Sequence, residues 1–130
     1  MALVLDSEQQ MLKDSAAEFC RKRSPITEFR KLRDEPVDTG YSAELWGSMV
    51  EMGWTGAIFP EELGGFDFGY RGMGAILEET GRSLVMSPLL STVVLSGSTI
   101  MLAGSDAQKS ELIPAIIGGE KLISLALDAG

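Results

Sequence analysis

Three charged residues at helical spacing are the side chains in this sequence best placed to act together chemically. Glu78 and Glu79 precede Arg82 by four and three residues, the separations at which side chains pair across one turn of a helix. Ion pairs of this kind are common on exposed helix faces, where each contributes little. The pattern therefore favours a partly exposed ion-pair cluster.

Composition excludes several catalytic and metal-binding chemistries. The chain contains no histidine, so an imidazole base, a histidine triad or an imidazole metal ligand cannot come from it. A single cysteine, Cys20, rules out an intrachain disulfide and a cysteine-cluster metal site, and its apolar surroundings predict an inert core thiol. The net charge of −8 argues against a nucleic-acid partner, and against holding a polyanionic cofactor by simple attraction.

Small hydroxyl side chains form the other group with chemical potential, within a stretch that carries no charge over residues 83–105. The stretch is long enough to span a bilayer, but a proline, two glycines and six serines interrupt it. We therefore expect a buried helix over about residues 89–103. Hydroxyls on such a helix either bond back to a carbonyl one turn earlier or line a ligand cavity. Both interpretations stay open for Ser91, Thr92, Ser96, Ser98 and Thr99.

Capping signals and hydrophobic spacing predict the helices that position these groups. Asp6 with Gln9, and Ser105 with Gln108, have the pattern of N-terminal capping boxes. Helices are expected over about residues 6–24, 26–33, 42–52, 70–83, 89–103 and 105–117.

The last apolar run, residues 122–127, has the pattern of a short buried strand. A lone strand has no partner for its backbone groups, so we expect a sheet domain to begin there and to be cut short. The predicted fold class is all-α: a bundle of five to six helices over residues 1–121 that ends in one terminal β-strand, with residues 122–130 the truncated start of a β-domain.

A glycine-rich link joins two of the expected helices over residues 53–69. Gly64 and Gly65 permit backbone angles closed to other residues, and Pro60 restricts its own backbone and that of the residue before it. Four aromatic residues predict a link that packs in place: Trp54, Phe59, Phe66 and Phe68.

The order of these features resembles the N-terminal domain of the acyl-CoA dehydrogenases. The resemblance covers essentially the whole chain, and the order and spacing of four segments make it specific. They are the Pro60–Gly65 loop, the Glu78-Glu79-x-Gly81-Arg82 helix, the Ala103-Gly104-Ser105-Asp106-x-Gln108-Lys109 junction, and the exit from Leu112-Ile113-Pro114 to Gly118-Gly119-Glu120.

This resemblance implies an FAD enzyme that oxidises acyl-CoA thioesters at the α,β carbons and passes electrons to an electron-transfer flavoprotein or a similar acceptor. In the family, a carboxylate takes the α-proton and the flavin accepts a hydride. The FAD site and the catalytic glutamate lie mainly in the middle β-domain and the C-terminal domain, which would follow Gly130. No catalytic residue is therefore expected in this chain, which should be inactive alone. A homo- or hetero-oligomer is implied, and the lack of a signal-peptide pattern makes a cytoplasmic location the expectation.

The resemblance also assigns binding residues by position. In the family, the helix that follows Ser87 and Pro88 runs beside the acyl chain. Ser91, Thr92 and Leu95 are therefore expected to line one wall of the acyl pocket, with Ser87 and Pro88 near its mouth. The terminal segment passes the flavin in the family, which assigns cofactor binding to Leu125, Leu127 and Asp128.

One departure from the family pattern lies in that terminal segment. Asp128 and Ala129 stand where the family often has threonine and glutamate. A carboxylate beside a reduced, anionic flavin is unfavourable unless it is protonated or turned away. This leaves open an alternative, in which the protein is a non-catalytic structural subunit or interaction domain that pairs with an active homologue.

Overall fold

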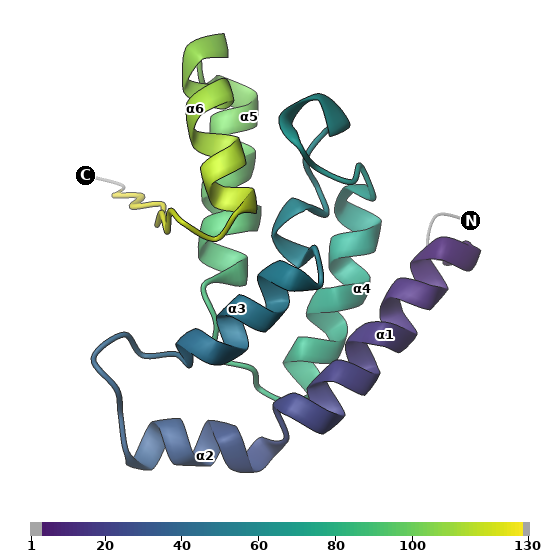
Figure 1. Ribbon diagram of the computed structural model, residues 1–130, viewed down its shortest axis with the longest axis vertical. Coiled ribbons are helices and arrows are strands. Elements are labelled where there is room, and N and C mark those ends of the chain that lie inside the picture. The colour runs from purple at the N-terminus through teal and green to yellow at the C-terminus, as the bar shows by residue number, and fades with distance from the viewer. Residues whose placement is uncertain (1–3, 129–130) are drawn as a thin grey trace.

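The computed structural model describes residues 4–128, and all the regular structure in this part of the chain is helical (Figure 1). The α-helices are α1 (Ser7–Arg23), α2 (Ile26–Asp34), α3 (Ala43–Glu51), α4 (Gly69–Arg82), α5 (Ser98–Ala103) and α6 (Asp106–Ile117). Two 3₁₀ turns, η1 (Trp54–Gly56) and η2 (Glu61–Leu63), and a π-helix, η3 (Leu89–Gly97), complete the set. The predicted helical bundle is confirmed.

The helices pack in two pairs around a central element. Helix α1 packs along α4 on one side of the molecule, and α5 packs against α6 on the other, with α3 between the two pairs (Figure 1). Helix α2 crosses the base. The continuous run from η3 into α5 places residues 89–103 beside α6 and η1.

Both predicted capping boxes form. The Asp6 carboxylate accepts a hydrogen bond from the Gln9 amide at 2.8 Å, and the Gln9 side chain accepts one from the Asp6 amide at 3.1 Å. Ser105 and Gln108 exchange the equivalent bonds at 3.2 and 2.9 Å. Helices α1 and α6 begin at these residues because the side chains satisfy amides that have no partner within the helix.

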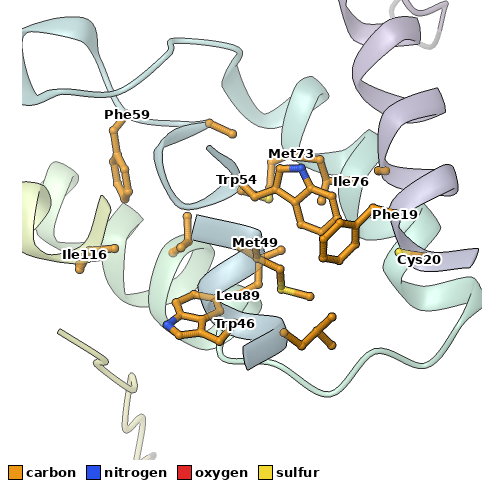
Figure 2. Packing of buried hydrophobic residues seen from close by; sticks show 14 of the residues in the cluster. Phe19, Cys20, Trp46, Met49, Trp54, Phe59, Met73, Ile76, Leu89 and Ile116 are labelled. Carbon is orange, nitrogen blue, oxygen red and sulfur yellow. The ribbon is translucent and has the colours of Figure 1, made fainter. Parts of the chain in front are cut away.

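Aromatic side chains fill the centre of the core (Figure 2). The rings of Phe19 and Trp54 meet edge to face, with centroids 4.8 Å apart. Trp54, Phe59 and Met49 have no exposed surface, and Ile116 closes the core from α6. Burial of these residues joins the α1–α4 pair to the α5–α6 pair.

The link over residues 53–68 is ordered by its own backbone hydrogen bonds. The amides of Phe66, Asp67 and Phe68 donate to carbonyls eight to eleven residues earlier, at 3.0, 3.0 and 2.8 Å. The link packs in place as predicted: Trp54 and Phe59 are buried, while Phe66 packs on the surface and is 50 % exposed. Its ring packs on the backbone of Gly53 and Gly56, where the absence of side chains leaves room for it.

The predicted helix over residues 89–103 forms, with two differences. Its first part, Leu89–Gly97, has π geometry, and the chain becomes α-helical at Ser98. Burial is not all round, since Leu102 is 86 % exposed. The hydroxyls of Ser91, Ser96 and Thr99 donate to carbonyls three to five residues earlier, the back-bonding expected of such residues on a helix.

The predicted terminal strand over residues 122–127 does not form within residues 4–128, where no strand occurs. A strand needs a neighbouring strand to pair with its amides and carbonyls. The segment instead lies along η3, where side-chain hydroxyls bond the backbone of Ile123.

Candidate functional site

An open groove of about 540 Å³ lies at the start of η3. The helix start and the turn before it form one side, the loop between α2 and α3 forms another, and the segment after α6 borders the remainder. Its lining residues are Thr39, Gly40, Tyr41, Val85, Met86, Ser87, Pro88, Leu90, Ser91, Thr92, Leu122 and Ser124.

Four of the five residues that the sequence assigns to an acyl pocket lie together in this groove: Ser87, Pro88, Ser91 and Thr92. The fifth, Leu95, does not line it and is 45 % exposed. Leu95 lies about one turn further along η3, beyond the residues that line the groove. The substrate-binding role of all five remains a prediction.

Local backbone geometry brings the groove residues together. Leu84 adopts a left-handed conformation, with φ of 52°, which turns the chain sharply after α4. The Ser87 hydroxyl then accepts a hydrogen bond from the Leu89 amide at 3.3 Å. This bond satisfies an amide in the first turn of the helix, where none is available from the helix itself.

The hydroxyl of Ser91 is bonded to the backbone. It donates to the Pro88 carbonyl at 3.2 Å, which is the back-bonding alternative considered for the sequence. Ser91 still borders the groove, so its small side chain provides room there. The groove surface is therefore mainly apolar around Val85, Leu90 and Leu122.

A second open groove continues from the first toward α4. It has a volume of about 430 Å³ and shares Val85, Ser87 and Leu90 with its neighbour. Leu77, Leu84 and Leu89 add apolar walls. Together the two grooves offer an elongated apolar surface along the turn between α4 and η3.

Several groove residues have no signal in the sequence. Thr39, Gly40 and Tyr41 belong to a charged, irregular region that nothing in the pattern connects to η3. Leu122 and Ser124 lie in the run that predicts a strand. Their position beside the groove depends on contacts between distant segments, which hydrophobic spacing does not encode.

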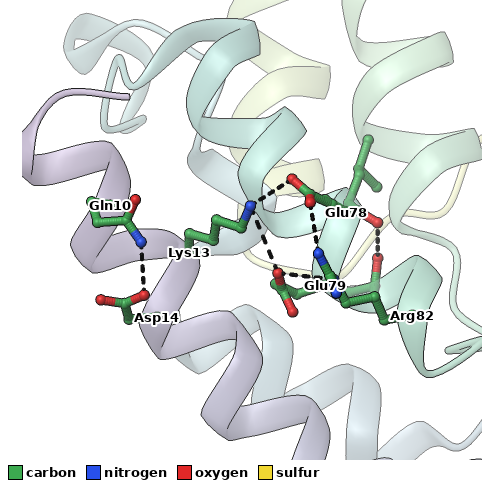
Figure 3. A network of polar contacts seen from close by, with 8 residues as sticks. Gln10, Lys13, Asp14, Glu78, Glu79 and Arg82 are labelled. Atoms are coloured by element: carbon green, nitrogen blue, oxygen red, sulfur yellow. Dashed lines mark hydrogen bonds and ion pairs between the residues drawn. The ribbon is translucent and has the colours of Figure 1, made fainter. Parts of the chain in front are cut away.

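The charged cluster predicted from Glu78, Glu79 and Arg82 forms, and Lys13 of α1 joins it (Figure 3). Lys13 Nζ lies 2.7 Å from Glu78 Oε2, and Arg82 Nη2 lies 3.0 Å from Glu78 Oε1. The hydrogen bond from Lys13, followed by that from Arg82, lowers the pKa of Glu78 below its ordinary value. None of the four borders the groove, so the cluster connects α1 to α4 and is structural.

Cys20 is an inert core residue, as the sequence predicts. It is 2 % exposed, and burial, with a smaller effect from the charge of Glu79, raises the pKa of its thiol to about 11. A thiol with that pKa remains protonated near neutral pH and is a poor nucleophile.

The residues that the resemblance assigns to a cofactor are exposed in the described part of the chain. Leu125 is 45 % exposed and Leu127 is 90 % exposed, and Asp128 is also exposed. None of the three lines the groove. Three exposed side chains do not enclose a dinucleotide by themselves, so their cofactor-binding role remains a prediction and we derive no chemical step through a flavin.

Residues 4–128 contain neither a cluster of metal-ligating side chains nor a membrane-spanning helix. No group of three or more metal-ligating side chains occurs there. Helices of the length and apolarity needed to cross a membrane are absent from the same residues.

The fold and the groove define an all-helical domain with an elongated apolar surface beside a π-helix. The family model for the acyl-CoA dehydrogenase N-terminal domain matches residues 6–120. Because the match covers most of the chain, this protein belongs to that family, and the resemblance seen in the sequence is confirmed.

Individual relatives agree with this assignment. The chain is 32 % identical over 120 residues to (2S)-methylsuccinyl-CoA dehydrogenase of Cereibacter sphaeroides, covering 91 % of this chain and 21 % of the relative. The ChsE4–ChsE5 complex of Mycobacterium tuberculosis shares the fold, with a TM-score of 0.87 at 24 % identity over 100 % of this chain and 35 % of its own. An acyl-CoA dehydrogenase of Bacillus anthracis complexed with FAD gives a TM-score of 0.76 at 26 % identity, covering 91 % and 20 % respectively. This chain thus spans between a fifth and about a third of the length of these relatives.

Proposed function

We propose that this chain is the N-terminal helical domain of an FAD-dependent acyl-CoA dehydrogenase and forms one wall of its acyl pocket. The observation that carries the proposal is the convergence of Ser87, Pro88, Ser91 and Thr92 on one groove, in a chain that belongs to this family. Residues 1–121 would form the helical domain, and residues 122–130 would begin the middle β-domain.

The chemistry of the groove suits an acyl chain. A cavity for a hydrocarbon tail needs apolar walls and few unpaired polar groups. Leu77, Leu84, Leu90 and Leu122 supply apolar walls, and the Ser91 hydroxyl is already bonded to backbone. The small side chain of Ser91 leaves space for an acyl group of some bulk.

The remaining parts of the reaction would come from outside this chain. A relative of similar fold is described as complexed with FAD, and here Leu125, Leu127 and Asp128 are exposed and do not line the groove. We therefore propose that FAD and the catalytic base are supplied by the other domains of the complete enzyme, and that an electron-transfer flavoprotein or a similar acceptor reoxidises the flavin. Chemical activity is not expected of this chain alone.

Exposed leucines support a place in a larger assembly. Leu95, Leu102 and Leu127, in η3, α5 and the segment after α6, are between 45 % and 90 % exposed. Apolar surface of this kind is typical of faces that other domains or subunits cover. We propose that the complete protein is a homo- or hetero-oligomer.

A substitution that fills the groove tests the acyl-wall role. In the complete enzyme that contains this domain, Ser91→Phe should raise KM for acyl-CoA about tenfold or more, since even one methylene of mismatch in an apolar pocket changes discrimination by roughly that amount. Ser110→Phe is the matched control, because Ser110 is exposed on α6 and does not line the groove. Equal kinetics for the two variants would contradict the proposal.

A non-catalytic subunit is the second candidate, and the exposed carboxylate of Asp128 at the position of the family threonine favours it. The two candidates differ in a single assay. An active enzyme reduces its own bound flavin when acyl-CoA is added without an acceptor, and the flavin absorbance falls. A structural subunit leaves the flavin absorbance unchanged and restores activity only when a catalytic homologue is added.

A further inference from the structure

Ile123 is held against η3 more firmly than its neighbours in the chain. Over residues 121–128 it is the one side chain that is not exposed, and it packs on the hydrophobic core. Its amide donates to Thr92 Oγ1 at 3.2 Å. Its carbonyl accepts from Thr92 Oγ1 at 3.0 Å and from Ser96 Oγ at 3.0 Å.

These contacts satisfy every backbone polar group of Ile123. A carbonyl oxygen has two lone pairs, and here each faces a hydroxyl. Thr92 and Ser96 are 1 % and 3 % exposed, so both hydroxyls require partners inside the protein. The single O–H of Ser96 is shared between the Ile123 carbonyl and the Ser91 carbonyl, which lies 2.8 Å away and five residues earlier on the π-helix.

The position of Ile123 determines which residues border the groove. Leu122 and Ser124, on either side of it, both line the groove. Moving the segment by one residue would place one of these two against Thr92 and remove the other from the groove. A backbone contact at one residue therefore decides the composition of a groove wall, as register does between paired strands.

We propose that Thr92 and Ser96 are positioning residues that form a hydroxyl clamp on Ile123, and that the clamp builds the second wall of the acyl groove from Leu122 and Ser124. The inference rests on the proposed function. It changes the role of Thr92: its hydroxyl holds the protein backbone, and the acyl chain meets the neighbours of Ile123.

Hydrogen exchange of the Ile123 amide tests the clamp directly in this chain. Thr92→Val keeps the shape of the side chain and removes both bonds to Ile123, so the amide should exchange about tenfold faster or more. Thr92→Ser keeps the hydroxyl and should retain most of the protection. Thr99→Val is the matched control, because the Thr99 hydroxyl bonds only to the Leu95 carbonyl of its own helix.

Circular dichroism of each variant confirms that the helices remain folded. Faster exchange in Thr92→Val, with protection in Thr92→Ser and Thr99→Val, supports the clamp. Equal exchange at Ile123 in all three variants overturns it.

Kinetics of the complete enzyme test the effect on the groove. Thr92→Val should raise KM several-fold for acyl-CoA substrates and change kcat less, because the wall binds substrate without touching the reacting atoms. Thr99→Val should change neither constant. If the Ile123 amide exchanges faster in Thr92→Val but KM stays unchanged for every acyl chain length, the clamp has no role in the groove. A wild-type enzyme that oxidises no acyl-CoA overturns the proposed function, while the exchange result still decides the clamp.

Discussion

At the scale of single residues, a few close approaches decide the shape of this domain. The link over residues 53–68 folds back on itself so tightly that a Cβ atom built on Gly65 would lie 2.0 Å from the Phe59 carbonyl oxygen. On η3, a Cβ atom on Gly97 would lie 2.4 Å from the Phe59 ring. Phe59 is therefore enclosed by two glycines from distant segments, and this contact joins the link to the helix that carries the groove.

Gly65→Ala should destabilise the domain by about 3 kcal/mol, at the upper end of what overpacking costs, because backbone atoms cannot move aside as a flexible side chain can. Urea denaturation followed by circular dichroism measures the change as a lower midpoint. Gly74→Ala is the matched control, since nothing lies within 4 Å of its Cβ position on the exposed side of α4. That control should gain up to about 1 kcal/mol from helix propensity. A Gly65→Ala variant as stable as the control would contradict this prediction, because it would show that the backbone of the link moves to make room for the added methyl group.

At the scale of elements, the helices were predictable where their ends depend on neighbouring residues. Asp6 and Ser105 begin helices through bonds that reach only three residues along the chain, so the sequence contains all the information needed. The same holds for the cluster on α4, whose spacing is local. Lys13 could not be predicted as a member, because it comes from α1, 65 residues earlier than Glu78.

The errors at this scale share a physical cause. The run over residues 122–127 has the composition of a strand, but its backbone partners are the hydroxyls of Thr92 and Ser96, which lie far away in sequence. The aromatic residues predict a packed link, but they do not reveal that Phe66 is half exposed with its ring over the backbone of Gly53 and Gly56. Of the candidate site, the part on consecutive residues after Ser87 was predictable. The loop at Tyr41 and the wall at Leu122 depend on tertiary packing.

The contact between α1 and α4 should depend on pH through Glu78. Its pKa is lowered from 4.5 by Lys13 and then Arg82, so its contribution to stability is fully present above about pH 4.5 and is lost as pH falls through the lower folded-state pKa. Glu78→Gln should lower Tm at neutral pH and reduce the decline of Tm with acid below about pH 4.5. Thermal melts from pH 7 down to pH 3 measure both effects.

Glu111→Gln provides the control for that measurement. Glu111 is exposed on α6 and makes none of the contacts of the cluster, so its replacement should leave the acid dependence of Tm close to that of the wild type. A Glu78→Gln variant with the same acid dependence as the wild type would contradict the role of the cluster.

At the scale of the whole molecule, the described surface carries an open apolar groove on a chain of strongly negative net charge. The groove and its extension toward α4 are open and apolar. The chain carries a net charge of −8, which repels the pyrophosphate of a dinucleotide over distances of about a Debye length. The residues assigned to the flavin by family position, Leu125, Leu127 and Asp128, lie outside the groove. The apolar groove therefore suits an acyl chain better than a charged dinucleotide.

The 130-residue chain alone should retain no FAD through gel filtration. FAD remains bound during gel filtration only if a site encloses much of the cofactor. The exposed leucines after α6 could contact FAD on one side but would not enclose it. Absorbance at the flavin wavelengths, measured across the protein peak after incubation with excess FAD, checks the result, and a flavoprotein of known stoichiometry on the same column sets the scale. Flavin eluting with this chain in stoichiometric amount would mean that copies of the domain build a complete cofactor site between them, and the division of labour proposed between this domain and the remainder of the enzyme would then be wrong.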